Sequence, residues 1–240
     1  MASPSLESRA LREWERITAG PAVADSSRPR LGAWIGVLVR LSVKVLVVAL
    51  LPFLALVRTA VFLYQHERYP TVVALLGGIA CTTAVVAAYG AWLSRRFTGR
   101  LRLALIARRI ALPVALAYCG YALLYLSSAN TKSEQVRAYY LSLHPLLRVA
   151  LSTVILADRD LVVTDLARRP TDYAAMGLPV RDGSLHFIQA DGYTHAADLR
   201  TAGRGELGNR LVQLYFWSMG LSTLRHVGTA DHLHVELPLR

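Results

Sequence analysis

The sequence predicts an all-α region of three transmembrane helices, followed by an α+β ectodomain with a small antiparallel sheet and flanking helices. Its 240 residues are 54% hydrophobic and only 18% charged, with a mean hydropathy of +0.36, which is too apolar for one soluble domain. Charge is divided unevenly: residues 1–128 hold 15 Lys/Arg and 5 Asp/Glu, whereas residues 129–240 hold 12 and 11. The basic excess therefore flanks apolar segments, where it sets topology and meets anionic lipid, and does not indicate nucleic-acid binding.

The membrane region lies within residues 35–128. Its second span is the clearest, because residues 71–93 carry no charged side chain over 23 positions, enough to cross a bilayer. We place the first span at about 42–64 and the third at about 110–128. None of the three contains an acidic residue, so they offer few groups for an ion pathway, and a transporter is not expected. Residues 1–34 form a polar tail with one short amphipathic helix near its start.

The distribution of arginines predicts how the three spans are oriented in the membrane. Residues 95–109, between the second and third spans, contain six arginines and no acid, whereas the HERYP connection at 66–70 is short and nearly balanced. The positive-inside rule then places the tail and the arginine-rich segment in the cytoplasm. The third span would deliver residues 129–240 across the inner (cytoplasmic) membrane to the periplasm or cell-wall side.

The ectodomain is expected to alternate helices and strands. The pattern predicts, in order, a helix, a strand, two hairpin strands, a helix and a strand, over residues 133–156, 161–166, 184–189, 193–200, 206–219 and 231–237. Pro145 interrupts or bends the first helix, and Gly220 stops the second. The pair Asp191-Gly192 is the hairpin signal. Together these elements make a small α+β domain.

The last predicted strand carries an unusual polar face. His232, His234 and Glu236 alternate along DHLHVEL, so a strand would place all three on one face. Imidazole is the commonest protein ligand for a metal, and a catalytic zinc needs three protein ligands plus an open position. We expect His234 to be one ligand, and a carboxylate and a second histidine to come from the hairpin.

The register of that hairpin decides the second histidine, which is His186 or His195, with Asp198 as the carboxylate. His195 and Asp198 are three positions apart on one predicted strand, so they point to opposite faces. A two-residue turn would also separate His186 from Asp198. A three-residue loop with Gly192 in the left-handed region, or a bulge, brings them together. We favour His186, and His195 remains the alternative.

Three segments resemble the motifs of the LAS metallopeptidases. They are SLH (184–186), HAADLRT (195–201) and DHLHVEL (231–237). The group includes D-alanyl-D-alanine carboxypeptidases and dipeptidases, penicillin-insensitive murein endopeptidases and the hedgehog domain. Its pattern is S-x-H-x-x-G-x-A-x-D followed by a C-terminal H-x-H. Here the hairpin is longer than in the pattern, while Asp198 and His234 stand 36 positions apart with one predicted helix between them.

The resemblance implies an LAS- or hedgehog-like ectodomain in which His186, Asp198 and His234 hold Zn²⁺. His232 would act as general base or stabilise the oxyanion, because no E-x-x-H glutamate precedes it. The segment TDLAR (164–168) resembles the one whose arginine holds substrate in that family. Arg168 would therefore bind a substrate carboxylate by a bidentate contact.

Glu236 and three further histidines stand outside the favoured ligand set. Glu236 is expected to be solvated, and His195, if it is not a ligand, to lie in a cleft wall or on the surface. His144 and His226 are given no role.

The function implied by the resemblance is that of a membrane-anchored zinc metallopeptidase. It would hydrolyse peptide bonds of peptidoglycan, in stem or cross-link peptides that contain D-amino acids. The alternative is a non-catalytic, zinc-stabilised ectodomain that binds or senses peptidoglycan, with His195 closing a four-ligand site. The expected partners are a peptidoglycan peptide and the lipid bilayer, and no nucleic acid.

Overall fold

The computed structural model describes residues 6–18, 31–169, 171–172, 177, 183–228 and 231–239. Its contacts divide the chain into two units, residues 1–48 and 49–240. The first unit contains α1 (Leu6–Thr18), the amphipathic helix expected in the tail, and the beginning of α2 (Leu31–Gln65). The second unit contains the rest of α2 and all later elements.

Within the described ranges, three helical segments are long and apolar enough to cross a membrane: Trp34–Gln65 of α2, then α3 (Thr71–Thr98), and Leu103–Leu124. The last of these is composite, and its parts are α4 (Leu103–Ile106), the π-helical turn η1 (Ala107–Ala111) and α5 (Leu112–Leu124). The prediction of three spans is confirmed in number and approximate place. The helices are longer than predicted at the arginine-rich segment, where only residues 99–102 separate α3 from α4.

A close helix crossing joins α2 to α3 at Gly78. A Cβ atom on Gly78 would lie 2.5 Å from the carbonyl oxygen of Leu56 and 3.0 Å from the Cβ of Ala60. Nearby, the Thr82 hydroxyl donates a hydrogen bond to the carbonyl of Pro52 at 2.6 Å. Small residues at a crossing let membrane helices approach closely, so Gly78 fixes the α2–α3 contact.

Residues 129–240, the region predicted to be an ectodomain and given that name here, have two short helices and one longer helix where a single helix was expected. These are α6 (Glu134–Ala138), η3 (Tyr140–Ser142) and α7 (Pro145–Ala157). Pro145 does not bend a helix; it starts α7 as its first residue, where its missing N–H costs nothing. The ring of His144 caps this start by accepting a hydrogen bond from the Leu146 N–H at 3.3 Å.

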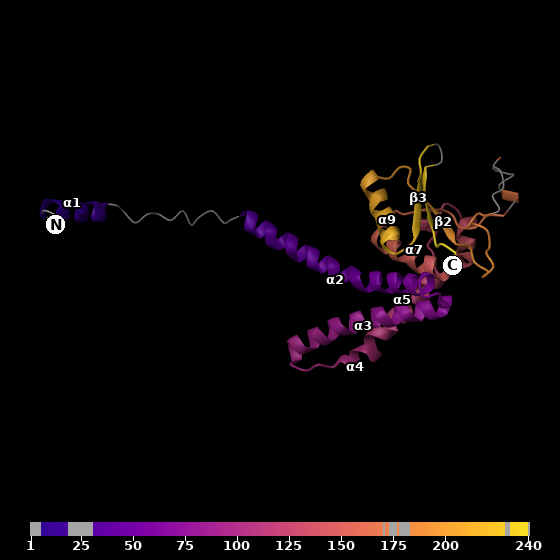
Figure 1. Cartoon of the computed structure of the whole chain (residues 1–240), viewed down its shortest axis with the longest axis horizontal. Helices are drawn as coiled ribbons and strands as arrows, with labels where there is room; N and C mark the ends of the chain where they lie inside the picture. Colours follow the sequence, from indigo (N-terminus) through magenta and orange to yellow (C-terminus); the bar gives the residue numbers. More distant parts are fainter. Residues whose placement is uncertain are drawn as a thin grey trace. The chain divides into compact units, whose positions relative to one another are not determined.

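Four antiparallel strands form one sheet in the order β1-β2-β4-β3 (Figure 1). They are β1 (Val163–Asp165), β2 (Ala196–Arg200), β3 (Ser222–His226) and β4 (His232–Glu236). The predicted helix is α9 (Glu206–Ser218), and the chain leaves it at Gly220 with φ of 89°. Strand β3 was not predicted. Figure 1 shows α9 beside β3, on the outer side of the domain.

The predicted strand over residues 184–189 is wrong, because this segment is a series of turns. Its backbone hydrogen bonds are split between two partners: the His186 carbonyl accepts the Arg168 N–H at 3.0 Å, whereas the Leu185 carbonyl accepts the His195 N–H at 2.8 Å. The loop that follows is of the three-residue kind, since the Gln189 N–H donates to the Tyr193 carbonyl at 2.8 Å and Gly192 has φ of 83°. Thus His186 lies on a loop, while β2 starts only at Ala196.

The two faces of the sheet have different environments. Ala197, Leu199, Leu233 and Val235 point to one face, are buried, and pack in the same core as α7 and α9. Asp198 and its neighbours point to the other face. The register pairs Asp198 with His234, and His234 in turn with Leu224, so these side chains share the face away from the core.

One hydrophobic core joins the ectodomain to the membrane-crossing helices. The cluster includes Leu56 and Val61 of α2 together with Leu147 and Leu151 of α7. Polar contacts reinforce the junction: the Tyr118 hydroxyl lies 2.7 Å from that of Thr153. Experiments on this protein should therefore use the whole chain.

Candidate metal site

Three side chains converge on the open face of the sheet. Asp198 and His234 stand opposite each other on the central strands β2 and β4, and His186 reaches them from its loop. From Asp198 Oδ1, His234 Nδ1 lies at 2.8 Å and His186 Nε2 at 3.2 Å. The two ring nitrogens are 3.4 Å apart. One ion could therefore contact all three atoms, which lie within 4.8 Å of one another.

These three groups suit a divalent metal. Two imidazole nitrogens and one carboxylate oxygen form a three-ligand set of the kind that catalytic zinc uses. His186 and Asp198 are buried, whereas His234 is partly exposed, so the group is closed on one side and open on the other. The Nδ1 atom of His186 is buried and has no hydrogen-bond partner among the residues that the structure describes. The His186 ring is thus held through Nε2, the atom that faces the other two groups.

The electrostatics of the group are coupled. Burial raises the pKa of Asp198, but hydrogen bonds from His186 and His234 and the charge of Arg168 outweigh it and hold that pKa well below its usual range. Burial lowers the pKa of His234, yet the bond to Asp198 and the nearby Glu236 carboxylate raise it overall. Asp198 is therefore an anion at all physiological pH values. The raised pKa means that His234 holds its proton more tightly than a free imidazole does. A metal that binds at His234 has to displace this proton.

Arg168 lies beside the group. Its Nη2 donates to Asp198 Oδ2 at 2.5 Å, and its Nε pairs with Asp165. Oδ2 is thereby engaged, and Oδ1 is the oxygen that faces the two histidines. This geometry orients the Asp198 carboxylate. Binding of a substrate carboxylate by Arg168 stays a prediction.

His232 lines the open side. Its Nε2 is 3.8 Å from Asp198 Oδ1, and its side chain is partly exposed. His226, for which no role was expected, stacks on it with ring centroids 4.6 Å apart. The reason is the register of the missed strand, which pairs His226 with His232. A prediction of STLRH as a strand paired with β4 would have placed His226 next to His232 at the site.

Glu236 is part of the same constellation. Its Oε2 lies 3.3 Å from His234 Nε2, so the expectation of a purely solvated Glu236 is wrong. A carboxylate on the second nitrogen of a ligating imidazole fixes its tautomer and raises its basicity. A proton on Nε2 would leave the Nδ1 lone pair for a metal once the Nδ1 proton that is bonded to Asp198 has been lost.

A second histidine group lies at the junction with the membrane-crossing helices. His195 Nε2 is 2.9 Å from Asp191 Oδ2, and His144 Nε2 is 3.8 Å from the same oxygen and 3.1 Å from the Thr71 hydroxyl. Both rings are completely buried. The expectation of His195 in a cleft wall or on the surface is therefore wrong.

The hydrogen bonds of this second group favour a structural role. Nδ1 of His144 accepts the Leu146 N–H, so its proton belongs on Nε2, which then has no lone pair for a metal. His195 Nδ1 contacts the Leu237 carbonyl at 3.2 Å, and its other nitrogen is engaged by Asp191. Burial raises the pKa of Asp191, but hydrogen bonds from His195 and from the Tyr193 N–H, together with the charges of His195 and His144, outweigh it and lower that pKa. His195 is thus committed to Asp191 and directed away from the first group.

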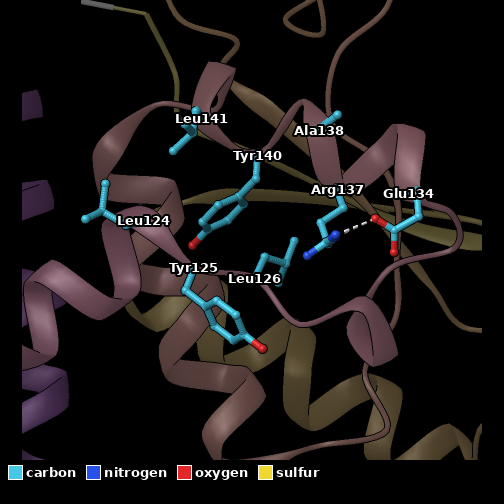
Figure 2. Close-up of a pocket in the computed structure, with 8 residues that line it drawn as sticks. All are labelled: Leu124, Tyr125, Leu126, Glu134, Arg137, Ala138, Tyr140 and Leu141. Carbon is cyan, nitrogen blue, oxygen red and sulfur yellow. Dashed lines mark hydrogen bonds and ion pairs between the residues drawn. The ribbon is translucent and has the colours of Figure 1, made fainter.

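A separate pocket of about 280 Å³ lies where α5 ends, lined by residues of α6 and η3. Figure 2 shows the Arg137 side chain directed toward Glu134 in this pocket, and the two form an ion pair at 2.6 Å. Tyr140 and Leu126 line the apolar part. None of the histidines lines this pocket, so it is distinct from the candidate metal site.

Neither protein-family models, nor curated proteins, nor solved structures give a match to this chain. The resemblance to LAS metallopeptidases therefore rests on the sequence motifs. What the structure adds is the α+β layout and the convergence of His186, Asp198 and His234.

Proposed function

We propose that this protein is a membrane-anchored zinc metallopeptidase that hydrolyses peptide bonds of peptidoglycan. The observation that carries the proposal is the convergence of His186 Nε2, Asp198 Oδ1 and His234 Nδ1 beside the partly exposed His232. Two histidines and one carboxylate leave an open position for water, as in catalytic zinc sites. The metal, when bound, would lower the pKa of that water and polarise the scissile carbonyl.

The residues around the ligands have separable tasks. His232 Nε2 is on the open side, where it can accept a proton from water or donate one to the leaving amine. Arg168 orients Asp198, and Glu236 orients His234. Leu224, on the same face of the edge strand β3, offers an exposed apolar surface for a substrate side chain.

The proposed location follows from the charge pattern. The arginines around 95–109 favour a cytoplasmic N-terminus and a periplasmic or extracellular site on an inner-membrane anchor. Peptidoglycan is the substrate implied by the resemblance, specifically stem or cross-link peptides with D-amino acids. A fixed anchor would hold the site close to that polymer.

The test compares the purified full-length chain with His234→Ala and with His66→Ala, a histidine outside the ectodomain. Zinc content and release of peptides from isolated peptidoglycan are measured for each. We expect His234→Ala to lose both zinc and hydrolysis, and His66→Ala to keep both. Hydrolysis retained by His234→Ala would contradict the proposal.

One observation favours a second candidate, a zinc-stabilised ectodomain that binds peptidoglycan without cleaving it. Arg168, the expected substrate-binding residue, is paired with Asp165 and Asp198. His232→Ala separates the two candidates, because His232 is expected not to ligate the metal. An enzyme should keep zinc and lose most hydrolysis, whereas a binding domain should show no hydrolysis even in the wild type and should still sediment with peptidoglycan.

A further inference from the structure

Helix α9 has an unusually apolar outer side. Its exposed residues include four large hydrophobic side chains, with exposed fractions of 73%, 57%, 55% and 68%, at Leu207, Leu211, Leu214 and Trp217. They recur at helical spacing and form one stripe, named here the α9 stripe. The opposite side of α9 is buried against the core. A row of this kind on a small domain marks an interaction surface.

The C-terminal end of α9 meets one of the membrane-crossing helices. A Cβ atom on Gly220 would lie 2.6 Å from Arg58 Nη1 and 3.2 Å from Val61 Cγ1, both on α2. Arg58 stands seven residues before the end of α2 at Gln65, about 10 Å along the helix axis. A cation near the end of a span is expected to hold its guanidinium at the interface between lipid and water. Trp217 is therefore close to that interface.

We propose that the α9 stripe lies on the membrane, with its leucines and Trp217 inserted among the lipids of the leaflet on the ectodomain side. The occupant of this face is the bilayer to which the chain is already tethered. A short amphipathic helix with Leu and Trp on one side has the composition of an interfacial helix, and Trp prefers the headgroup level.

Charge and packing agree with this occupant. Arg210 is exposed beside the stripe and pairs with Glu206 at 3.0 Å, so the carboxylate next to the stripe is balanced by a cation. The Tyr215 hydroxyl donates to the Ala150 carbonyl of α7 at 2.9 Å, which fixes the rotation of α9 against the core. Because α9 is fixed in this way and the residue after it lies at Arg58, we expect the stripe to meet lipid next to the C-terminal part of α2.

Quenching of tryptophan fluorescence by brominated lipid tests the proposal. The full chain with Trp14→Phe, Trp34→Phe and Trp92→Phe retains Trp217 alone; all three replaced residues are exposed. It is reconstituted in vesicles of phosphatidylcholine and phosphatidylglycerol, with and without bromine near the carbonyl end of the acyl chains. The matched control adds Trp217→Phe and Leu224→Trp. Leu224 is as exposed as Leu211 but lies on the sheet face opposite α9.

We expect brominated lipid to remove most of the Trp217 fluorescence and little of that from the Leu224→Trp control. Adding Leu211→Asp and Leu214→Asp to the Trp217 protein should reduce the quenching to the control level while zinc content is retained. Absence of quenching at Trp217 would overturn the proposal and leave water or a second copy of the chain against the stripe. Equal quenching at both positions would overturn it as well. The readout needs no hydrolysis, so its failure is distinct from failure of the peptidase proposal.

Discussion

His186 Nε2 lies 3.2 Å from Asp198 Oδ1, although His186 belongs to a loop and Asp198 to the central strand β2. The contact depends on the three-residue loop that turns at Gly192, where φ is 83°. A metal held by both residues would cross-link this loop to the sheet. Metal binding should therefore also stabilise the fold.

The Asp198 carboxylate is expected to be indispensable for metal and important for stability. Asp198→Asn should abolish zinc binding, because it removes the anionic ligand. In the zinc-free protein we expect the free energy of unfolding to fall by about 2 kcal/mol. This is less than the ~3–5 kcal/mol lost when a fully buried ion pair is broken, because Arg168 still pairs with Asp165. Thermal unfolding in detergent and metal analysis measure the two effects. Asp165→Asn is the control that should lose stability and keep zinc.

Glu236 should matter for metal affinity although it is not expected to be a ligand. Removal of its contact with His234 Nε2 by Glu236→Gln is expected to weaken zinc binding by about 10- to 100-fold. Competition with a chelating dye measures the affinity. Glu134→Gln, which changes an exposed carboxylate in the separate pocket, is expected to bind zinc like the wild type. An unchanged affinity in Glu236→Gln would show that the Glu236 contact has no role.

The raised pKa of His234 predicts how metal affinity depends on pH. Zinc must displace the His234 proton, so below this pKa the affinity should fall about tenfold per pH unit. The stability of the metal-free fold should change with pH in the opposite sense. Protonated His234 stabilises it below the ordinary pKa of about 6.5, and this stabilisation is lost as pH rises through the raised value. Zinc titrations from about pH 5 to about pH 8 check the first effect; an affinity independent of pH would contradict it.

The crossing of α2 and α3 should be intolerant of a single methyl group. Gly78→Ala places a Cβ atom 2.5 Å from the Leu56 carbonyl oxygen, so the helices have to separate. We expect a loss of about 1–3 kcal/mol in the free energy of unfolding. Gly120→Ala on α5 is the matched control, because nothing lies within 4 Å of its Cβ position. Thermal unfolding of both variants in the same detergent compares them directly, and equal midpoints would contradict the prediction.

The sequence predicts the membrane region well because long uncharged apolar runs have few alternatives. It also predicts β4 and α9, whose polar and apolar residues alternate with the right periods. The missed strand β3 is short, polar and partly exposed along its length, so no apolar alternation distinguishes it. SLHFIQ has a strand-like pattern, yet its His186 carbonyl bonds to the Arg168 segment, a long-range contact that local pattern does not contain.

The candidate site illustrates the same limit. Asp198 and His234 are recognisable from the motif and its spacing, and the register of β2 and β4 places them opposite each other. His144 is missed because an isolated histidine before Pro145 resembles an ordinary loop residue. The signal was available in part, since a polar residue before Pro is a typical helix start. Its burial against Thr71 depends on how the ectodomain packs on α3.

The zinc content of the full-length chain, compared with that of His186→Ala and His195→Ala, tests the central claim most directly. The geometry of the two histidine groups predicts about one zinc per chain in the wild type and in His195→Ala, and none in His186→Ala. His195→Ala is expected to be less stable, because its ring is buried between Asp191 and the Leu237 carbonyl. Zinc lost with His195 and retained without His186 would contradict the assignment of the metal site.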